Sequence, residues 1–297
     1  MAIHPELLTP AKINLFLRIT GRRSDGYHEL DSVFLPVSLY DRITLEARAA
    51  PASEVSLRCN WADLPLDGRN LALRAATLFL DQTGLRWRVR INLHKEIPAA
   101  AGLGGGSSDA GAVLRLMAQR ARIEVPALAA AALRLGADVP FFLDPRPARI
   151  GGVGERITDI ASRFDLHLVI GVPPIAVPTA EIYRYLKRAD WSGPGPEALP
   201  ALVDADAAAA GLLVNDLERP ALARYPQIGE VKVLLKHLGA AEALMSGSGG
   251  AVFGIFQDPA RAVQAAAAAW RRMPQGRFFA ARIAPRNHSS TALWHAC

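Results

Sequence analysis

Apolar and polar side chains alternate near the start of the chain. Between residues 11 and 20, Ala, Ile, Leu, Leu and Ile occupy the odd positions, and the even positions carry Lys12, Asn14, Phe16, Arg18 and Thr20. A period of two predicts a β-strand over 11–20. The segment 21–26, which is rich in Gly, Ser and Asp, predicts a turn immediately after it.

The same analysis extended along the chain predicts a mixture of strands and helices. Asn70 is a candidate N-cap for one helix, and Gly136 ends another. Gly151–Gly154 indicates a turn, and the segment 190–200, with two glycines and three prolines, predicts a flexible loop. We expect strands at 31–38, 42–48, 54–59, 87–94, 166–172, 241–245, 251–256 and 278–284, and helices at 70–82, 126–135, 201–211, 227–238 and 259–271.

The length of 297 residues corresponds to one large domain or two modest ones. Because the pattern changes near 150–165, we expect domains at 1–160 and 161–297. With 51% apolar and 21% charged residues, the composition excludes a disordered chain. No stretch reaches about 18 consecutive apolar residues, so no membrane span is expected.

The chain has two cysteines, Cys59 and Cys297, which lie far apart in the sequence. They provide no basis for a disulfide framework, and a reducing compartment fits best. The first ten residues lack the charged-then-apolar layout of a signal peptide. The sequence therefore predicts a cytoplasmic protein.

The formal net charge is +6, and the 34 basic residues comprise 29 Arg and 5 Lys. Two interpretations are open: a solvated basic surface, or an anionic partner. Histidines show no metal-ligand spacing, so a protein metal site is not predicted.

A glycine-rich segment, Gly102–Asp109, precedes apolar residues at helical spacing. Backbone N–H groups at a helix N-terminus suit an anion, and Ser107 and Ser108 add hydroxyl donors. The alternative is a tight turn with glycine packing. The segment is not a Walker A motif, because no Gly-Lys-Ser/Thr follows, and it is a poor dinucleotide fingerprint.

Two charged residues stand in apolar surroundings. Lys12 shares a strand face with Asn14, and Asp138 lies in the apolar run 135–142. An aspartate can accept or orient a hydroxyl proton in phosphoryl transfer, while a lysine stabilises developing charge. The alternatives are a solvent-exposed lysine on an edge strand and a carboxylate that caps a helix or turn.

Three separated segments together resemble one superfamily. They are Pro10–Leu15, Pro98–Ser108 and Ser246–Phe253. The sequence is similar here to the kinases named after galactokinase, homoserine kinase, mevalonate kinase and phosphomevalonate kinase (GHMP kinases). Thr20–Leu30 and Leu135–Phe141 narrow the resemblance to a branch that phosphorylates a cytidine diphosphate ester of methylerythritol in non-mevalonate isoprenoid synthesis.

The resemblance implies an α+β fold of two domains with the active site between them. The N-terminal domain would resemble ribosomal protein S5 domain 2, and the C-terminal domain would be ferredoxin-like. It also implies ATP as co-substrate, with Mg²⁺ arriving on its phosphates, transfer to the 2-hydroxyl of the ester, and a monomer or weak homodimer. Lys12 and Asp138 would be catalytic, and the ATP phosphates would lie over Pro98, Ala99, Ala100, Ala101, Gly102, Leu103, Gly104, Gly105, Gly106, Ser107, Ser108 and Asp109.

Substrate binding is implied for a second group of residues. Aromatic stacking on the cytidine ring would come from Tyr27, His28, Phe34 and Tyr183, although each ring could equally be packing in the core or on the surface. Hydrogen bonds would come from Asn14 and Thr179, and the last glycine loop would contribute Gly247, Ser248 and Gly249.

The chain departs from the family pattern at a few positions. Alanines stand at 99–101 where the family often has glycines, and Tyr183 replaces a frequent Phe. Asp109 stands where some relatives have Asn, and its charge would repel phosphates unless it faces Mg²⁺ or another cation.

Three other functions remain open at this level. Homoserine or mevalonate kinase activity is the nearest, although Asp25–His28 argues against it. A nucleic-acid-binding module would fit the net charge, but no basic tract or aromatic RNA motif is present. A dinucleotide oxidoreductase is disfavoured by the glycine loop.

Overall fold

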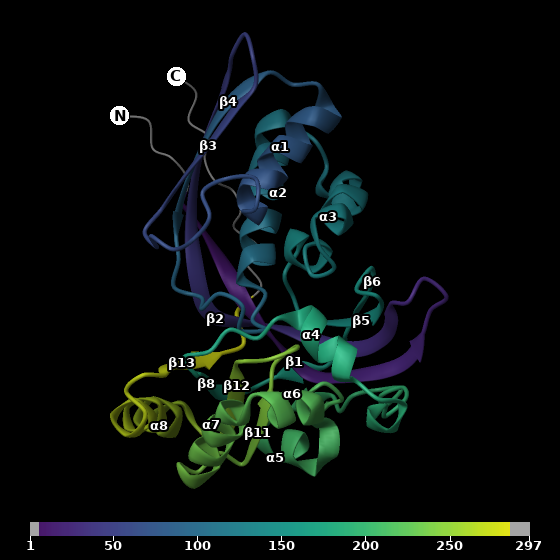
Figure 1. The fold of residues 1–297 in the computed structure, drawn as a ribbon, viewed down its shortest axis with the longest axis vertical. Helices are drawn as coiled ribbons and strands as arrows, with labels where there is room; N and C mark the ends of the chain where they lie inside the picture. The colour runs from purple at the N-terminus through teal and green to yellow at the C-terminus, as the bar shows by residue number, and fades with distance from the viewer. Residues whose placement is uncertain (1–5, 286–297) are drawn as a thin grey trace.

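The computed structural model describes residues 6–285. Figure 1 shows helices α1–α3 together at one end of the molecule, helices α5–α8 at the other, and the long strands β1 and β2 running between them. The strands are β1 Glu6–Arg22, β2 His28–Ala49, β3 Glu54–Cys59, β4 Trp87–His94, β5 Ala148–Gly152, β6 Arg156–Asp159, β7 Arg163–Phe164, β8 His167–Val172, β9 Leu202–Val203, β10 Val214–Asn215, β11 Glu242–Met245, β12 Val252–Phe256 and β13 Arg277–Arg282.

The helices group around the two larger sheets. They are α1 Leu71–Thr83, α2 Gly105–Ala121, α3 Ala129–Leu135, α4 Thr179–Tyr185, α5 Ala205–Ala207, α6 Glu218–Arg224, α7 Pro226–His237 and α8 Pro259–Arg272, with short 3₁₀ turns at Val125–Leu128 (η1), Pro140–Leu143 (η2) and Arg188–Asp190 (η3). None of the helices in the described part of the chain has the length and apolar character to cross a membrane.

Two sheets organise the fold. A seven-stranded sheet has the order β10-β1-β2-β4-β3, with β5 paired to β2 and β6 to β5. A four-stranded sheet has the order β11-β12-β8-β13 and is antiparallel throughout. The α+β class expected from the sequence is therefore confirmed.

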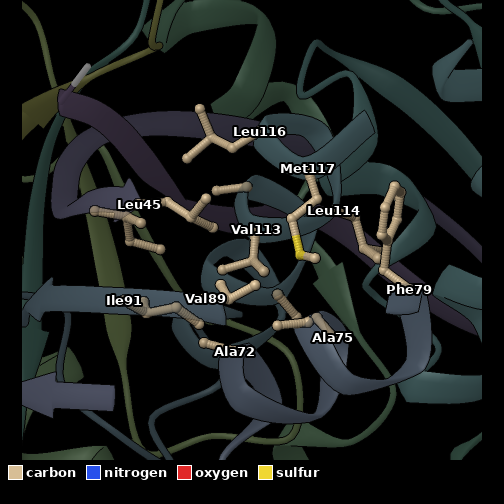
Figure 2. Packing of buried hydrophobic residues seen from close by; sticks show 14 of the residues in the cluster. Leu45, Ala72, Ala75, Phe79, Val89, Ile91, Val113, Leu114, Leu116 and Met117 are labelled. Atoms are coloured by element: carbon tan, nitrogen blue, oxygen red, sulfur yellow. The ribbon is translucent and has the colours of Figure 1, made fainter. Parts of the chain in front are cut away.

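The first sheet is covered by α1 and α2, which pack their apolar faces on β2 and β4. Figure 2 shows this core, with Leu45, Val89 and Ile91 of the strands meeting Phe79 of α1 and Met117 of α2. Asn70 caps α1 as predicted, because its side chain accepts a hydrogen bond from the Ala72 N–H. The cap and the buried stripe together fix where α1 begins.

The alternation in β1 determines which way its polar residues face. Ala11, Ile13 and Leu15 are fully buried in a cluster with residues of β8 and β12, such as Ile170 and Phe253. Since successive side chains of a strand point to opposite faces, Lys12 and Asn14 face away from the second sheet.

Several predicted elements are confirmed, and others differ. The strands at 54–59 and 87–94 match their predicted limits. The two strands predicted at 31–38 and 42–48 are instead one strand, β2, because Ser38 and Leu39 form a bulge opposite Pro10 and Ala11 and the chain does not turn there. The helix predicted at 201–211 is confirmed only in its middle, where α5 continues into a π-helical turn at Ala208–Leu212 (η4). At its ends the prediction is wrong, because Leu202 and Val203 pair with β7 and Gly211 has a φ of 100°.

The loop at 190–200 is irregular, as predicted, but several hydrogen bonds anchor it. The Gly195 N–H donates to Asp31 Oδ2 over 2.6 Å, and Arg149 donates to the carbonyl oxygens of Pro196 and Glu197. The Ser192 N–H donates to an oxygen of Asp216 over 2.8 Å. These hydrogen bonds fix residues 192–197 against β2, β5 and Asp216, and the flexibility of the loop stays a prediction.

Candidate active site

A cavity of about 500 Å³ lies where β1, the glycine-rich loop and the start of α4 come together. Its lining unites residues that are more than 200 positions apart in the sequence. Of the residues singled out from the sequence, it is lined by Lys12, Asn14, Phe34, Pro98, Ala99, Ala100, Ala101, Gly102, Leu103, Gly104, Gly105, Gly106, Ser107, Asp109, Asp138, Thr179, Tyr183, Gly247 and Ser248.

Lys12 is buried in the middle of β1, with 3% of its surface exposed. Its Nζ donates to Asn14 Oδ1 over 2.8 Å and lies 4.7 Å above the Phe34 ring. The Lys12 N–H donates to the Leu103 carbonyl, which ties the strand to the glycine loop. The alternative of a solvent-exposed lysine is therefore wrong. Burial lowers the pKa of Lys12, and the charge of Asp138 partly opposes that shift.

Asp138 follows α3, and its side chain is 32% exposed. Its Oδ2 lies 3.8 Å from Lys12 Nζ, so the two charges form an ion pair across the cavity. The 3₁₀ turn η2 begins at Pro140 without a side-chain cap, so Asp138 does not cap it. The carboxylate is therefore available to a molecule in the cavity.

The glycine loop enters α2 at Gly105, and the first turn of this helix lines the cavity. Gly102 and Gly104 have φ values of 75° and 71°, which favour glycine. A Cβ at Gly102 would lie 2.2 Å from the Ser246 carbonyl oxygen, so the loop requires glycine there for close packing as well. Ala100 also has a positive φ, 51°, which is uncommon for a residue with a side chain. Its Cβ restricts the backbone conformations of this part of the loop more than a glycine would.

Ser108 and Asp109, the two residues that end the loop motif, form hydrogen bonds with other buried groups of the protein. Ser108 is buried, and its hydroxyl donates to the Pro10 carbonyl over 2.7 Å, which fixes α2 against β1. Asp109 accepts a hydrogen bond from Lys95 Nζ over 2.8 Å and another from Thr9 Oγ1 over 3.1 Å. The cation that the sequence required beside Asp109 is therefore Lys95.

The last glycine loop, residues 246–250, packs directly on the first. The Ser246 hydroxyl donates to the Gly102 carbonyl over 3.1 Å, and the Ala251 N–H donates to the Ala101 carbonyl over 2.9 Å. Ser248 Oγ and Thr179 Oγ1 are 2.8 Å apart at the cavity wall. Gly249 does not line the cavity; it has a φ of 97°, and a Cβ there would lie 2.8 Å from Met245 Sδ.

The four aromatic residues separate into two pairs. Phe34 and Tyr183 line the cavity, whereas Tyr27 is 67% exposed and His28 is absent from the lining. The His28 ring still packs against Tyr183, with ring centres 5.5 Å apart. Burial and the nearby Arg22 lower the pKa of His28, so its imidazole is neutral at pH 7.

The Asp138 carboxylate also affects the Tyr183 hydroxyl. Burial and the Asp138 carboxylate raise the pKa of its hydroxyl, which therefore stays protonated. The hydroxyl that distinguishes this residue from Phe is thus a neutral hydrogen-bond donor within the electrostatic reach of Asp138.

Sequence reasoning missed part of the lining and one supporting residue. Asn215, on β10, donates from Nδ2 to the carbonyls of Met245 and Gly247, both over 2.8 Å. No local pattern indicates this role, because the partners are 30 or more residues away. The other lining residues not predicted are Leu17, Leu30, Leu64, Pro65, Arg69, Asn70, Leu71, Lys95 and Leu217, of which Asn70 was identified only as a helix cap.

Comparison with known proteins defines the class first. Residues 70–144 match the family described as GHMP kinases N terminal domain, and residues 198–275 match GHMP kinases C terminal. A crystal structure of a homoserine kinase from Cytophaga hutchinsonii superposes with a TM-score of 0.73 at 15% identity over 95% of each chain, which shows the shared fold. The fold is that of a GHMP kinase.

More similar relatives define the branch. The 4-diphosphocytidyl-2-C-methyl-D-erythritol kinase of Syntrophotalea carbinolica is 41% identical and covers 84% of this chain and 89% of its own. That of Thermus thermophilus is 43% identical and covers 90% and 94%. A crystal structure of 4-(cytidine 5'-diphospho)-2C-methyl-D-erythritol kinase superposes with a TM-score of 0.81 at 40% identity, over 95% of this chain and all of its own. The chain belongs to the 4-diphosphocytidyl-2-C-methyl-D-erythritol kinase family.

Membership of this family decides between the functions left open by the sequence. The chain is a kinase, and ATP is the co-substrate that the family implies. The nucleic-acid-binding and oxidoreductase interpretations are set aside. The homoserine kinase of Cytophaga hutchinsonii and the mevalonate kinase of L. major share the fold with this chain at only 15% and 13% identity.

Proposed function

We propose that this chain transfers the γ-phosphoryl group of ATP to the 2-hydroxyl of 4-diphosphocytidyl-2-C-methyl-D-erythritol, giving the 2-phosphate and ADP. The observation that carries the proposal is the Lys12–Asp138 pair, 3.8 Å apart, in a cavity that also exposes the N-terminus of α2. The choice of substrate rests on the family relationship. The residues that line the cavity are of the types that could bind such a substrate and transfer phosphate to it.

The residues that line the cavity fall into two groups, one suited to ATP and the other to the cytidyl substrate. The glycine loop and the start of α2 present backbone N–H groups and the positive end of the helix dipole to the ATP phosphates. Leu64, Pro65 and Leu71 line the same cavity and offer an apolar surface for the nucleoside of ATP. Tyr183, Thr179 and Ser248 would receive the cytidyl substrate, with Tyr183 offering a face for stacking.

In the proposed transfer, the 2-hydroxyl oxygen forms a bond to the γ-phosphorus and the bond to the leaving ADP oxygen breaks. Asp138 orients the hydroxyl and can accept its proton, because its carboxylate is partly exposed to the cavity. Lys12, cationic beside Asp138 and Asn14, stabilises the negative charge that spreads over the transferring group.

We also propose that Mg²⁺ is bound mainly by the nucleotide phosphates, where it would neutralise their charge. The described residues contain no group of three or more His, Cys, Asp or Glu side chains that could hold a metal ion. Of the two carboxylates in the cavity lining, Asp109 is engaged by Lys95 and Thr9, so Asp138 is the one that could meet the metal or its waters.

Substitution of the pair tests the proposal. We expect Lys12→Met and Asp138→Asn each to lower kcat by about 100-fold or more, since each removes a charge that acts at the transferring group. Lys236→Met and Asp165→Asn, at partly exposed and exposed positions away from the cavity, make the same chemical changes as controls. Turnover of the cytidyl substrate by both cavity variants at the wild-type rate would contradict the assigned roles.

A further inference from the structure

Four buried side chains meet behind the glycine loop. Lys95, just beyond the end of β4, donates to Asp41 of β2 and, over 2.8 Å, to Asp109 of α2. Thr9 of β1 donates to the other oxygen of Asp109 over 3.1 Å. Each of the four is at most 4% exposed. We refer to Thr9, Asp41, Lys95 and Asp109 as the Lys95 cluster.

The Lys95 cluster holds both ends of the loop that we assign to the ATP phosphates. Asp41 Oδ1 accepts the N–H groups of Glu96 and Ile97, over 2.6 and 2.8 Å, immediately before the loop begins. Asp109 lies in α2, immediately after the loop ends. Lys95 and Asp109 also line the cavity, and a Cβ at Gly105 would lie 3.2 Å from Lys95 Nζ. A phosphate on the loop would therefore be within electrostatic reach of the cluster.

The charges of the cluster do not balance. One ammonium faces two carboxylates, which leaves one negative charge in excess when both are ionised. A buried pair of like charges favours protonation of one member. Asp41 receives hydrogen bonds from Lys95 and two backbone N–H groups, whereas Asp109 receives two within the described part of the chain, from Lys95 and Thr9. Asp109 is therefore the carboxyl that protonates more readily.

Titration of Asp109 is governed by groups on three elements. Burial is the largest influence, and together with the charge of Asp41 on β2 it raises the pKa of Asp109 to about 7. Lys95, after β4, and the hydroxyl of Thr9, on β1, oppose the shift. Asp109 thus changes charge near neutral pH, directly behind the proposed phosphate site.

We propose that nucleotide binding to the glycine loop is coupled to uptake of one proton by Asp109. The proton comes from the solvent and forms an O–H bond on the carboxyl, which removes the excess negative charge as phosphate approaches. Asp109 does not touch the nucleotide in this scheme; it sets the affinity of the loop through the charge of the cluster. The inference rests on the proposed function, because it takes the loop to be the phosphate site.

The coupling has a definite sign. Above its pKa Asp109 is ionised and repels phosphate, so the Kd for nucleotide should rise with pH, by at most about tenfold per pH unit. We expect wild-type protein to lose several-fold in MgADP affinity between about pH 6.5 and about pH 8.5. Asp109→Asn, a neutral isostere, should flatten that dependence apart from the titration of the nucleotide itself.

Calorimetric titration of MgADP in buffers of different ionisation enthalpy measures the proton directly. Wild-type protein should take up more protons than Asp109→Asn near neutral pH, and Asp165→Asn, at an exposed position away from the cavity, should retain the wild-type uptake. Thr9→Val removes the hydroxyl that favours ionised Asp109, so it should move the fall in affinity to higher pH. This variant, and the wild-type pH profile, keep the test valid if Asp109→Asn folds poorly.

Two results would overturn the coupling. One is equal proton uptake by wild-type protein and Asp109→Asn, and the other is a wild-type Kd that depends on pH no more than MgADP titration requires. Failure of folded wild-type protein to bind MgADP at any pH would instead overturn the kinase proposal, and the coupling with it. The two failures are therefore distinguishable.

Discussion

At the scale of single residues, the cavity depends on a lysine that is buried in an apolar sheet. Lys12 has the Asn14 oxygen, the Phe34 ring and the more distant Asp138 carboxylate as its neighbours. None of these neutralises it as closely as a direct hydrogen-bonded ion pair would. An anion in the cavity would give the Lys12 ammonium a close partner of opposite charge, as expected for a site that transfers phosphate.

Tyr183 provides a prediction at the same scale. Its ring lines the cavity and packs against His28, so Tyr183→Ala should raise KM for the cytidyl substrate by about tenfold, since base stacking contributes about 1–3 kcal/mol. Tyr183→Phe keeps the ring and should change KM far less. Steady-state kinetics on both variants checks this, and an equal KM for Tyr183→Ala and wild type would show that the ring does not bind the base.

Some residue roles could be predicted from the sequence, and others could not. Lys12 and Asn14 were found together because a strand places alternate residues on one face, a strictly local rule. Asp41 looked like part of a break between two strands, because its partner Lys95 is 54 positions away. Likewise, Tyr27 and His28 are adjacent in sequence to a turn, but only the folded chain shows that they lie outside the cavity lining.

At the scale of elements, two glycine loops from opposite parts of the chain are bonded to each other. Ser246 and Ala251 donate to carbonyls of the first loop, and Asn215 holds the second loop from behind. A Cβ at Gly247 would lie 3.2 Å from Lys12 Nζ, so the second loop also lies against the proposed catalytic lysine. The position of Lys12 relative to the phosphate loop therefore depends on both loops.

Asn215 is the residue that tests this dependence. Asn215→Ala removes two buried donors and leaves the Met245 and Gly247 carbonyls without them, so we expect kcat to fall by about tenfold or more. KM for ATP should change less, because the first loop keeps its own hydrogen bonds to β1. Asn92→Ala, on the exposed side of β4, is a matched control. Unchanged kcat in a folded Asn215→Ala would contradict the positioning role.

The limits of helices and strands with a cap or a clear period were predictable, whereas their pairing was not. Asn70 and the buried stripe located α1, and β3 and β4 had clean alternation. The hairpin of β5 and β6 was missed because Gly151 and Gly152 look like a turn, although they lie in the last part of β5. Both glycines pair with β2, although Gly152 has a φ of 68°, and no local signal in the sequence indicates that pairing.

At the scale of the whole molecule, the two larger sheets pack on each other. Strand β1 of the first sheet contributes apolar side chains to a buried cluster shared with β8 and β12 of the second sheet. We propose a domain division near residue 160, as the sequence suggested. The short strand β10 crosses that division to pair with β1, and its Asn215 donates to the second glycine loop, whose Gly247 lines the cavity. The proposed active site therefore needs both parts of the chain in place.

The Lys95 cluster also affects global stability. Because the pKa of Asp109 is raised to about 7 in the folded protein, its contribution is most favourable below its unfolded pKa of about 4 and is lost as pH rises through about 7. Asn at this position does not titrate. We therefore expect the Tm of Asp109→Asn, relative to wild type, to increase between about pH 5 and about pH 8. A difference in Tm that stays constant with pH would contradict the raised pKa.

The most direct test of the central claim is ATP- and Mg²⁺-dependent phosphorylation of 4-diphosphocytidyl-2-C-methyl-D-erythritol by the purified protein. The position of the new phosphate can be read by ³¹P NMR, with homoserine and mevalonate as competing acceptors. We predict stoichiometric formation of ADP and the 2-phosphate, with little transfer to the other two alcohols. Preferred phosphorylation of homoserine or mevalonate, or no turnover of the cytidyl substrate by folded protein, would contradict the proposed function.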